Sequence, residues 1–279
     1  MKRKLLYFGY FVIKKLGFLY LANRFSNYAS ILMFHRVNDY DSGPLTTPTV
    51  VFEKIIETIS KNYRAISLPS LIRIIKNNER LAPKTVVITF DDGYKDNYIY
   101  AAPILQRYGM PATFFITSGY IDTDKVFPWD MQSNVQHPLM TWEEVNKLSQ
   151  DGFDIGAHTE NHVILGEISL EKAKSDVVNS KRRIENEINK RVQTFAYPFG
   201  RKNCIRADVI PIIREAGFDC CCAGYGGKIT SKSDLYNLYR IPAYPSVIET
   251  MMELDNFMTY FDGKMSINMF ISYILNAKR

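Results

Sequence analysis

Two adjacent carboxylates follow a run of β-branched residues in the first third of the chain. Asp91 and Asp92 lie in the segment Thr-Phe-Asp-Asp-Gly that ends at Gly93, directly after Val, Val and Ile. The chemistry of a barrel is usually built at this place, the carboxyl end of a strand. Side chains alternate along a strand, but a turn at Gly93 would let both carboxylates reach one site. The alternative interpretation is a solvated turn, because Asp-Asp-Gly turns are common.

Two histidines four residues apart form the second group. His158 and His162 follow the apolar stretch 154–157, and the whole chain has only four histidines. Such a pair can hold one metal ion from a helical turn or a tight loop, as neutral imidazoles whose second nitrogens are fixed by other groups. The competing interpretation is a surface pair, or a pair satisfied by protein groups.

Asp92 with His158 and His162 would make a His-His-carboxylate set. This set leaves positions open for water and substrate, as a catalytic metal site requires. Such a metal polarises a carbonyl and lowers the pKa of its bound water, and a free carboxylate nearby can accept the proton of that water. Asp91 fits this role. Imidazole and carboxylate ligands suit zinc, our first expectation, and also cobalt, nickel or manganese.

With these motifs the chain resembles the polysaccharide deacetylase family (NodB-like, carbohydrate esterase family 4). The resemblance rests on 89–93, on 158–162 and on Tyr-Pro-Phe-Gly at 197–200, and it extends over roughly 31–241. It implies a distorted, incomplete (β/α) barrel, usually of seven strands, and metal-assisted hydrolysis of an acetyl group on a sugar. It also implies that Asp91 is the base and that Asp92, His158 and His162 are the ligands. The backbone N–H of Phe199 would donate to the oxyanion, a role typical of preorganised donors.

The chain departs from the family pattern at two points. Ala196 stands where an arginine is usual, so the cation that orients Asp91 must come from elsewhere, with Arg240 and Arg36 as candidates. No histidine follows His162, so the usual late histidine that protonates the leaving amine is missing.

His35 resembles the strand-end histidine of a circularly permuted branch of the family, which includes poly-N-acetylglucosamine deacetylases. In that branch the N-terminal strand supplies the acid, because the first and last strands of a barrel are neighbours. We therefore predict that His35 is the general acid. The alternative is a buried histidine satisfied by backbone groups, and His137 is interpreted as an ordinary loop residue.

Four aromatic residues near these motifs could stack on a sugar ring: Tyr94, Tyr120, Trp129 and Trp142. Aromatic residues more often belong to the core. We favour only Trp129 as a sugar platform, because it lies between Pro128 and Asp130 in a predicted loop.

The elements that must position these residues alternate between strand and helix. Short runs of β-branched and aromatic residues predict strands at 31–35, 64–68, 85–90, 112–117, 154–158, 194–198 and 218–223, with a weaker one at 239–243. Helical spacing of apolar residues predicts helices at 52–61, 98–108, 142–150 and 170–190. The pattern favours a single α/β domain, a (β/α) barrel of about seven strands over 29–245, with a helical tail of the same domain over 246–279.

The first 28 residues are predicted to form a basic amphipathic helical segment. Leu5, Val12, Ile13, Leu16 and Leu19 fall broadly on one helical face, with Lys14, Lys15 and Arg24 available to anionic head groups. The apolar run is too short to span a bilayer, and no convincing signal-peptide cleavage site follows it. We expect peripheral membrane contact through residues 2–24 or, equally, packing on the domain's own core. The expected location is the cytoplasm or the cytoplasmic face of a bacterial inner membrane.

Bulk composition narrows the class of protein. The hydrophobic content of 46% predicts a folded chain. The formal charge of +6 comes from dispersed Lys and Arg instead of one patch, and we expect no nucleic-acid partner. Cys204 and the run 220–222 fit no metal motif and are predicted to be buried, unpaired thiols.

The sequence therefore predicts an N-deacetylase that acts on an amino sugar in a polysaccharide or a lipid-linked glycan precursor. A deformylase or O-deacetylase on the same fold is the second hypothesis, because pocket shape sets acyl identity. The third is a catalytically silent carbohydrate-binding domain. The presence of Asp91 argues against the third, since a binding protein has no use for a base next to the metal.

Overall fold

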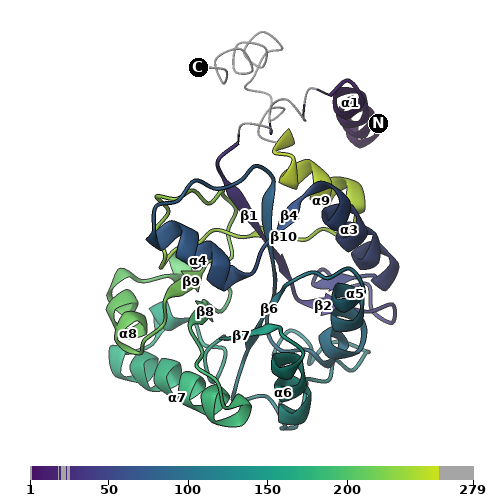
Figure 1. Cartoon of the computed structure of the whole chain (residues 1–279). Helices are drawn as coiled ribbons and strands as arrows, with labels where there is room; N and C mark the ends of the chain where they lie inside the picture. The colour runs from purple at the N-terminus through teal and green to yellow at the C-terminus, as the bar shows by residue number, and fades with distance from the viewer. Residues whose placement is uncertain (1, 18, 20–22, 24–25, 258–279) are drawn as a thin grey trace.

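The fold is an incomplete barrel of parallel strands with helices around its outside (Figure 1). A computed structural model describes residues 2–17, 19, 23 and 26–257. The main sheet runs in the order β10-β1-β5-β6-β7-β8-β9, and every pair in it is parallel. β4 pairs with the first two residues of β5, Thr85 and Val86. The predicted fold class is confirmed.

All eight predicted strands are present, most of them shorter than expected. They are β1 (Ala29–Phe34), β4 (Arg64–Ala65), β5 (Thr85–Phe90), β6 (Thr113–Ile116), β7 (Asp154–Ala157), β8 (Thr194–Ala196), β9 (Cys220–Cys222) and β10 (Ile241–Pro242). Every residue of β5 is buried, as expected for a parallel strand that is covered on both faces. The thiols of 204 and 220–222 are buried and unpaired, as predicted.

Most helices surround the outer face of this sheet, whereas α1 lies apart from the strands, next to α9 (Figure 1). Their bounds are α1 (Lys2–Lys15), α3 (Thr49–Asn62), α4 (Leu68–Lys76), α5 (Ala102–Arg107), α6 (Trp142–Gln150), α7 (Leu170–Ile188), α8 (Ile210–Glu215) and α9 (Val247–Leu254). α6 begins with a capping box in which Thr141 and Glu144 satisfy each other's backbone N–H groups. Gly109 and Gly152 follow α5 and α6 with positive φ, as predicted for helix ends.

Several elements were not predicted. The strand prediction for 64–68 ran too far, because Leu68 begins α4, where Ser67 accepts a hydrogen bond from the backbone N–H of Ser70 as N-cap. α8 is short, and β2 (Arg36–Val37) and β3 (Thr46–Thr47) form a two-residue parallel pair. Such short elements depend on tertiary contacts more than on periodicity. Of the predicted tail over 246–279, the structure describes α9, which packs against α3, and the residues up to 257.

The strand order decides which loops meet. Because all strands are parallel, their carboxyl ends lie at one end of the barrel. β1 lies between β10 and β5, with Phe34 opposite Phe90 and Leu32 opposite Ile241. The first strand is therefore a neighbour of the last. Residues 35 and 91 directly follow β1 and β5 at this end, and Arg240, which directly precedes β10, reaches Asp91 with its side chain.

Candidate metal centre and active site

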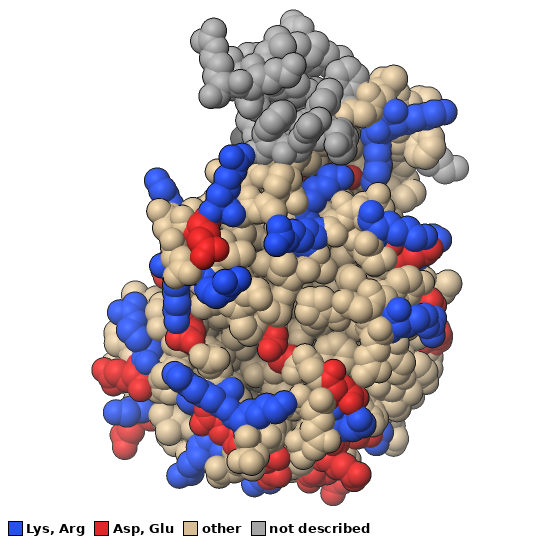
Figure 2. Space-filling model, viewed as in Figure 1, with Lys and Arg blue, Asp and Glu red and all other residues tan. Residues whose placement is uncertain are grey.

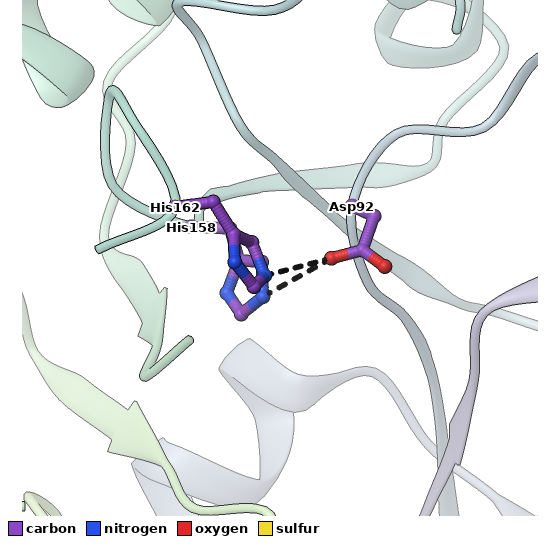
Figure 3. Close-up of side chains that lie close together, drawn as sticks. All are labelled: Asp92, His158 and His162. Atoms are coloured by element: carbon purple, nitrogen blue, oxygen red, sulfur yellow. Dashed lines mark ion pairs between the residues drawn. The ribbon is translucent and has the colours of Figure 1, made fainter. Parts of the chain in front are cut away.

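Asp92, His158 and His162 converge on one point at the carboxyl end of the barrel (Figure 3). One ligand atom from each lies within 4.8 Å of the others. Nε2 of His162 lies 3.1 Å from Asp92 Oδ1, and Nε2 of His158 lies 3.4 Å from the same oxygen. The three side chains are at most 6% exposed. The histidines come from the loop after β7, and not from a helical turn.

The donor set fits a divalent metal ion. Nδ1 of His158 lies 2.8 Å from the carbonyl oxygen of Ala196. A carbonyl can only accept, so Nδ1 carries the proton, and in the neutral form of the ring the Nε2 lone pair would face Asp92. Asp92 Oδ1 is buried and has no hydrogen-bond partner in the described part of the chain. Acceptor atoms that face each other at these distances are the arrangement that a cation between them stabilises.

Three of the predicted site residues have left-handed backbone conformations. The φ angles are +76° at Asp92, +54° at His162 and +60° at Phe199. Non-glycine residues rarely adopt this region, and each instance costs on the order of 1–3 kcal/mol. At Asp92 and Gly93 (φ +92°) the chain turns sharply after β5, which allows adjacent carboxylates to serve one site.

Asp91 forms a two-point ion pair with Arg240. Nη1 lies 2.6 Å from Oδ1 and Nη2 lies 2.7 Å from Oδ2, and both side chains are buried. Burial acts to raise the pKa of Asp91, but the Arg240 guanidinium and then His158 oppose it, so the net pKa is lowered. Of the two candidate cations, Arg240 is therefore the partner of Asp91. Arg36 contacts Asp41 and Asp130 instead.

His35 follows β1 and lines the same cavity as Asp91, Asp92 and Arg240. Burial lowers the pKa of His35, while the nearby carboxylates of Asp92 and then Asp91 act to raise it. Its backbone carbonyl accepts from Asn97 Nδ2 at 2.9 Å. In the part of the chain that the structure describes, no hydrogen bond holds its ring. Both ring nitrogens are thus available to hydrogen-bond or exchange a proton with a bound molecule, unlike those of a histidine satisfied by backbone groups.

The cavity has a volume of about 320 Å³. Its lining contains all six predicted site residues, namely His35, Asp91, Asp92, His158, His162 and Phe199, together with Met33, Leu45, Trp129, Arg201 and Arg240. Sequence reasoning missed Met33, Leu45 and Arg201. Arg201 directly follows the Tyr-Pro-Phe-Gly motif, and that position was the one available signal for it.

The Phe199 turn is fixed by its neighbours. A Cβ at Gly200 would lie 2.2 Å from the backbone nitrogen of Gly224, so only glycine fits there. Phe199 is 44% exposed, and the centre of its ring lies 4.9 Å from the centre of the His162 ring. No acceptor among the described residues takes the Phe199 N–H, and the predicted donor therefore has no competing partner.

Trp129 is the one member of the four aromatic candidates that lines the cavity. Its indole Nε1 donates to the Tyr94 hydroxyl at 2.9 Å. Phe127 stacks on Trp129 at 4.7 Å and on Tyr120 at 4.4 Å. Trp142 is 7% exposed at the start of α6, as a core residue. Tyr94 and Tyr120 therefore support Trp129 and do not line the cavity themselves.

His137 lies outside the metal cluster, as the sequence predicted. Its Nε2 is 3.4 Å from the Ser133 hydroxyl and 3.8 Å from Asp41 Oδ2.

Comparison with known proteins bears on this site. A family model described as polysaccharide deacetylase matches residues 78–221, just over half of the chain. The YxkH protein of Bacillus subtilis, named as a polysaccharide deacetylase, is 27% identical over 218 residues, which cover 78% of this chain and 72% of that protein. A poly-beta-1,6-N-acetyl-D-glucosamine N-deacetylase of Staphylococcus aureus is 28% identical over 172 residues, 60% of this chain and 57% of that enzyme.

Two solved structures share the fold. A deacetylase of Streptococcus pyogenes in complex with acetate superposes with a TM-score of 0.69 at 24% identity, covering 81% of this chain and 97% of that one. The IcaB protein of Ammonifex degensii superposes with a TM-score of 0.70 at 18% identity, covering 82% of this chain and 97% of that one.

Proposed function

The chain belongs to the polysaccharide deacetylase family, and from this premise we infer that it is a metal-dependent hydrolase that removes an N-acetyl group from an amino sugar. Its proposed substrate is a polysaccharide or a lipid-linked glycan precursor. The name of the staphylococcal relative supports a polymer of N-acetylglucosamine as the first substrate to test.

One observation carries the proposal. A single cavity of about 320 Å³ contains a three-residue donor set for a metal and, beside it, a carboxylate held by an arginine. Asp91 is not one of the three clustered residues, and the lowered pKa keeps it ionised at neutral pH. A carboxylate that is free of the metal and deprotonated is suited to act as a base.

Asp92, His158 and His162 would hold the divalent ion. When bound, it would supply Lewis acidity, polarising the acyl carbonyl and lowering the pKa of a water molecule. Zinc is the proposed metal, and cobalt, nickel or manganese would also suit these ligands.

The residues of the chain have separate roles in the proposed reaction. Asp91 takes a proton from the attacking water as the water oxygen bonds to the acyl carbon. The Phe199 N–H donates to the oxygen on which negative charge develops. His35 gives a proton to the nitrogen as the carbon–nitrogen bond breaks, which leaves acetate and a free amine. Trp129 offers an aromatic face to the sugar ring.

Two alternatives remain part of the proposal. A deformylase or O-deacetylase would use the same residues, because acyl identity depends on the shape of the cavity. A silent carbohydrate-binding domain would need neither Asp91 nor its arginine. Acetate and formate release from N-acetylated, N-formylated and O-acetylated oligomers, with zinc-loaded protein, separates these cases. We expect acetate from the N-acetylated oligomer. Glycan binding without release of either acid would favour the binding domain.

α1 supports peripheral membrane contact as a further part of the proposal. Tyr7 donates to Glu249 at 2.6 Å and Tyr10 donates to Asp255 at 2.7 Å, so polar groups hold one face of α1 against α9. Phe8 and Phe11 are 66% and 65% exposed. The helix has five basic residues and no acidic one. Exposed aromatics beside basic residues suit an anionic membrane surface.

The surface around α1 is also rich in basic side chains. In Figure 2 the charged side chains in the upper part of the visible face, where α1 and α9 lie, are mostly lysine and arginine, whereas acidic side chains are more frequent below. The predicted apolar face was partly wrong, because Leu19 is buried but Leu16 is 64% exposed. Leu5 and Arg24 lie outside the side chains that the structure describes. Among the described residues, no helix has the length and apolar character needed to cross a bilayer.

Vesicle sedimentation tests the membrane contact. We expect binding to phosphatidylglycerol vesicles, little binding to phosphatidylcholine, and loss of binding in a Phe8→Ser/Phe11→Ser variant. Val50→Ser, on the exposed surface of α3, is the matched control. Unchanged binding by the double variant would overturn this part of the proposal. The proposed location is the cytoplasmic face of a bacterial inner membrane, and fractionation that finds a cleaved, exported protein would contradict it.

A further inference from the structure

Arg36 joins two loops that line the cavity. It lies in β2, directly after His35, and is 4% exposed. Its guanidinium contacts two carboxylates, with Nη1 2.7 Å from Asp130 Oδ1 and Nη2 3.2 Å from Asp41 Oδ2. Asp41 belongs to the loop after β2, and Asp130 belongs to the long loop between β6 and α6.

The ion pair between Arg36 and Asp41 orders the segment that contains Leu45. The Asp41 carboxylate accepts hydrogen bonds from the Gly43 N–H at 2.9 Å and from the Thr46 hydroxyl. The backbone N–H of Arg36 donates to the carbonyl of Leu45 at 3.1 Å. Leu45 itself lines the cavity. Arg36 therefore fixes this wall through its side chain and its backbone.

The ion pair between Arg36 and Asp130 orders Trp129. Asp130 Oδ2 accepts from the Tyr94 hydroxyl at 2.6 Å, and the same hydroxyl accepts from Trp129 Nε1 at 2.9 Å. Asp130 is 6% exposed, and the Arg36 guanidinium is its buried ion-pair partner. The Arg36 guanidinium also lies 5.3 Å from the centre of the Tyr94 ring. The contacts thus form a continuous chain from Arg36 to the Trp129 indole, which lines the cavity.

We propose that Arg36 is a positioning residue that sets the walls formed by Leu45 and Trp129 around the sugar. This inference rests on the proposed function, and it gives Arg36 a role other than orienting Asp91. A planar guanidinium can hold two carboxylates in fixed directions, whereas a lysine ammonium offers one point charge. The residue acts on sugar binding, because its contacts lead to the walls and not to Asp91 or Asp92.

The test uses Arg36→Lys, made both in the natural chain and in a Trp142→Phe background. The chain has two tryptophans, so Trp129 alone reports in that background. We expect a shifted Trp129 emission and a KM for N-acetylglucosamine oligomers raised about tenfold, equivalent to about 1.4 kcal/mol of binding. We expect kcat and zinc content within about threefold of the parent, a margin of about 0.65 kcal/mol. Arg107→Lys, which alters an exposed pair with Glu53, is the control.

A lowered kcat with unchanged KM and unchanged Trp129 emission would overturn the proposal. If Arg36→Lys does not fold, Tyr94→Phe removes only the hydroxyl between Asp130 and Trp129. It must then shift the emission and raise KM, and failure to do both would also overturn the proposal. A parent protein that releases no acetate would count against the proposed function. The emission of Trp129, and its change on adding oligomer, would still test Arg36.

Discussion

Arg240 and Asp91 are 149 positions apart in the chain and form a buried, two-point ion pair, with N–O distances of 2.6 and 2.7 Å. Arg240 precedes β10, the last strand, and Asp91 follows β5. Arg240 Nε also donates to the carbonyl of Ala223 at 2.8 Å, which fixes the plane of the guanidinium. The pair gives the proposed base a set orientation and keeps it ionised.

Replacing Arg240 by lysine should slow the reaction and shift its pH dependence. A lysine keeps the positive charge but has a single ammonium group in place of the two guanidinium nitrogens that contact Asp91. We therefore expect kcat to fall about tenfold or more. Weaker pairing would also let the pKa of Asp91 rise from its lowered value. A base must be deprotonated, so the acid limb of the rate profile should move to higher pH. The measurement is kcat between pH 3 and 9, because the lowered pKa of Asp91 puts the acid limb of the parent below pH 3.8.

Arg206→Lys is the control for this substitution, since it alters the exposed pair between Arg206 and Asp208. Arg240→Ala would leave Asp91 buried without a cation and should destabilise the fold by about 3–5 kcal/mol. An Arg240→Lys enzyme with an unchanged rate and an unchanged profile would contradict the role given to the pair.

His35→Ala should slow the hydrolysis of substrates with a poor leaving group much more than the hydrolysis of substrates with a good one. A general acid contributes about 10²–10⁴-fold when the leaving amine needs a proton. We therefore expect a loss of that size for N-acetylated oligomers. Hydrolysis of 4-nitrophenyl acetate, whose leaving group needs no proton, should fall far less. Equal losses on both substrates would show that His35 is not the acid.

Zinc should stabilise the folded protein through the three clustered residues. A ligand that binds only the folded state adds about 2.7 kcal/mol at one hundred times its Kd. The Tm of the metal-free protein should therefore rise on adding zinc, and His162→Ala should lose most of that rise. His137→Ala, outside the cluster, should keep it. A full zinc response in His162→Ala would contradict the ligand assignment without any assay of activity.

Asp96→Asn should stabilise the protein more at pH 8 than at pH 5. Burial raises the pKa of Asp96 from 3.8 to about 7, against the hydrogen bond from Asn38 that acts to lower it. The folded state therefore holds a proton that the unfolded state has lost above pH 3.8, and stability falls as pH rises through this window. The shift corresponds to at most about 4 kcal/mol. Urea unfolding at both pH values measures it, with Asp124→Asn as the exposed control.

Much of the site followed from local sequence. The strand before Asp91 is a run of buried β-branched residues, and the spacing of His158 and His162 placed both in one loop after a strand. Parallel strands then bring their carboxyl ends together without further information. The metal cluster could be proposed for these reasons, before any distance was known.

Contacts between residues far apart in the sequence could not be predicted in the same way. Arg36 and Arg240 were both candidates to orient Asp91, and the pairing of β10 with β1 brings Arg240 to it. The contact of Asp130 with Arg36 joins residues 94 positions apart. Which face of α1 points outward is set in part by the hydrogen bond from Tyr10 to Asp255, near the other end of the described chain. Periodicity carries no information on such partners.

Acetate release by zinc-loaded protein, compared between the natural chain and Asp91→Asn, tests the central claim most directly. Asparagine keeps the shape of the side chain and cannot accept the proton. We predict release from N-acetylglucosamine oligomers by the natural chain and a loss of about 10²–10⁴-fold in the variant, with equal zinc content. Equal release by both proteins, or no release by a natural chain that binds zinc, would contradict the account.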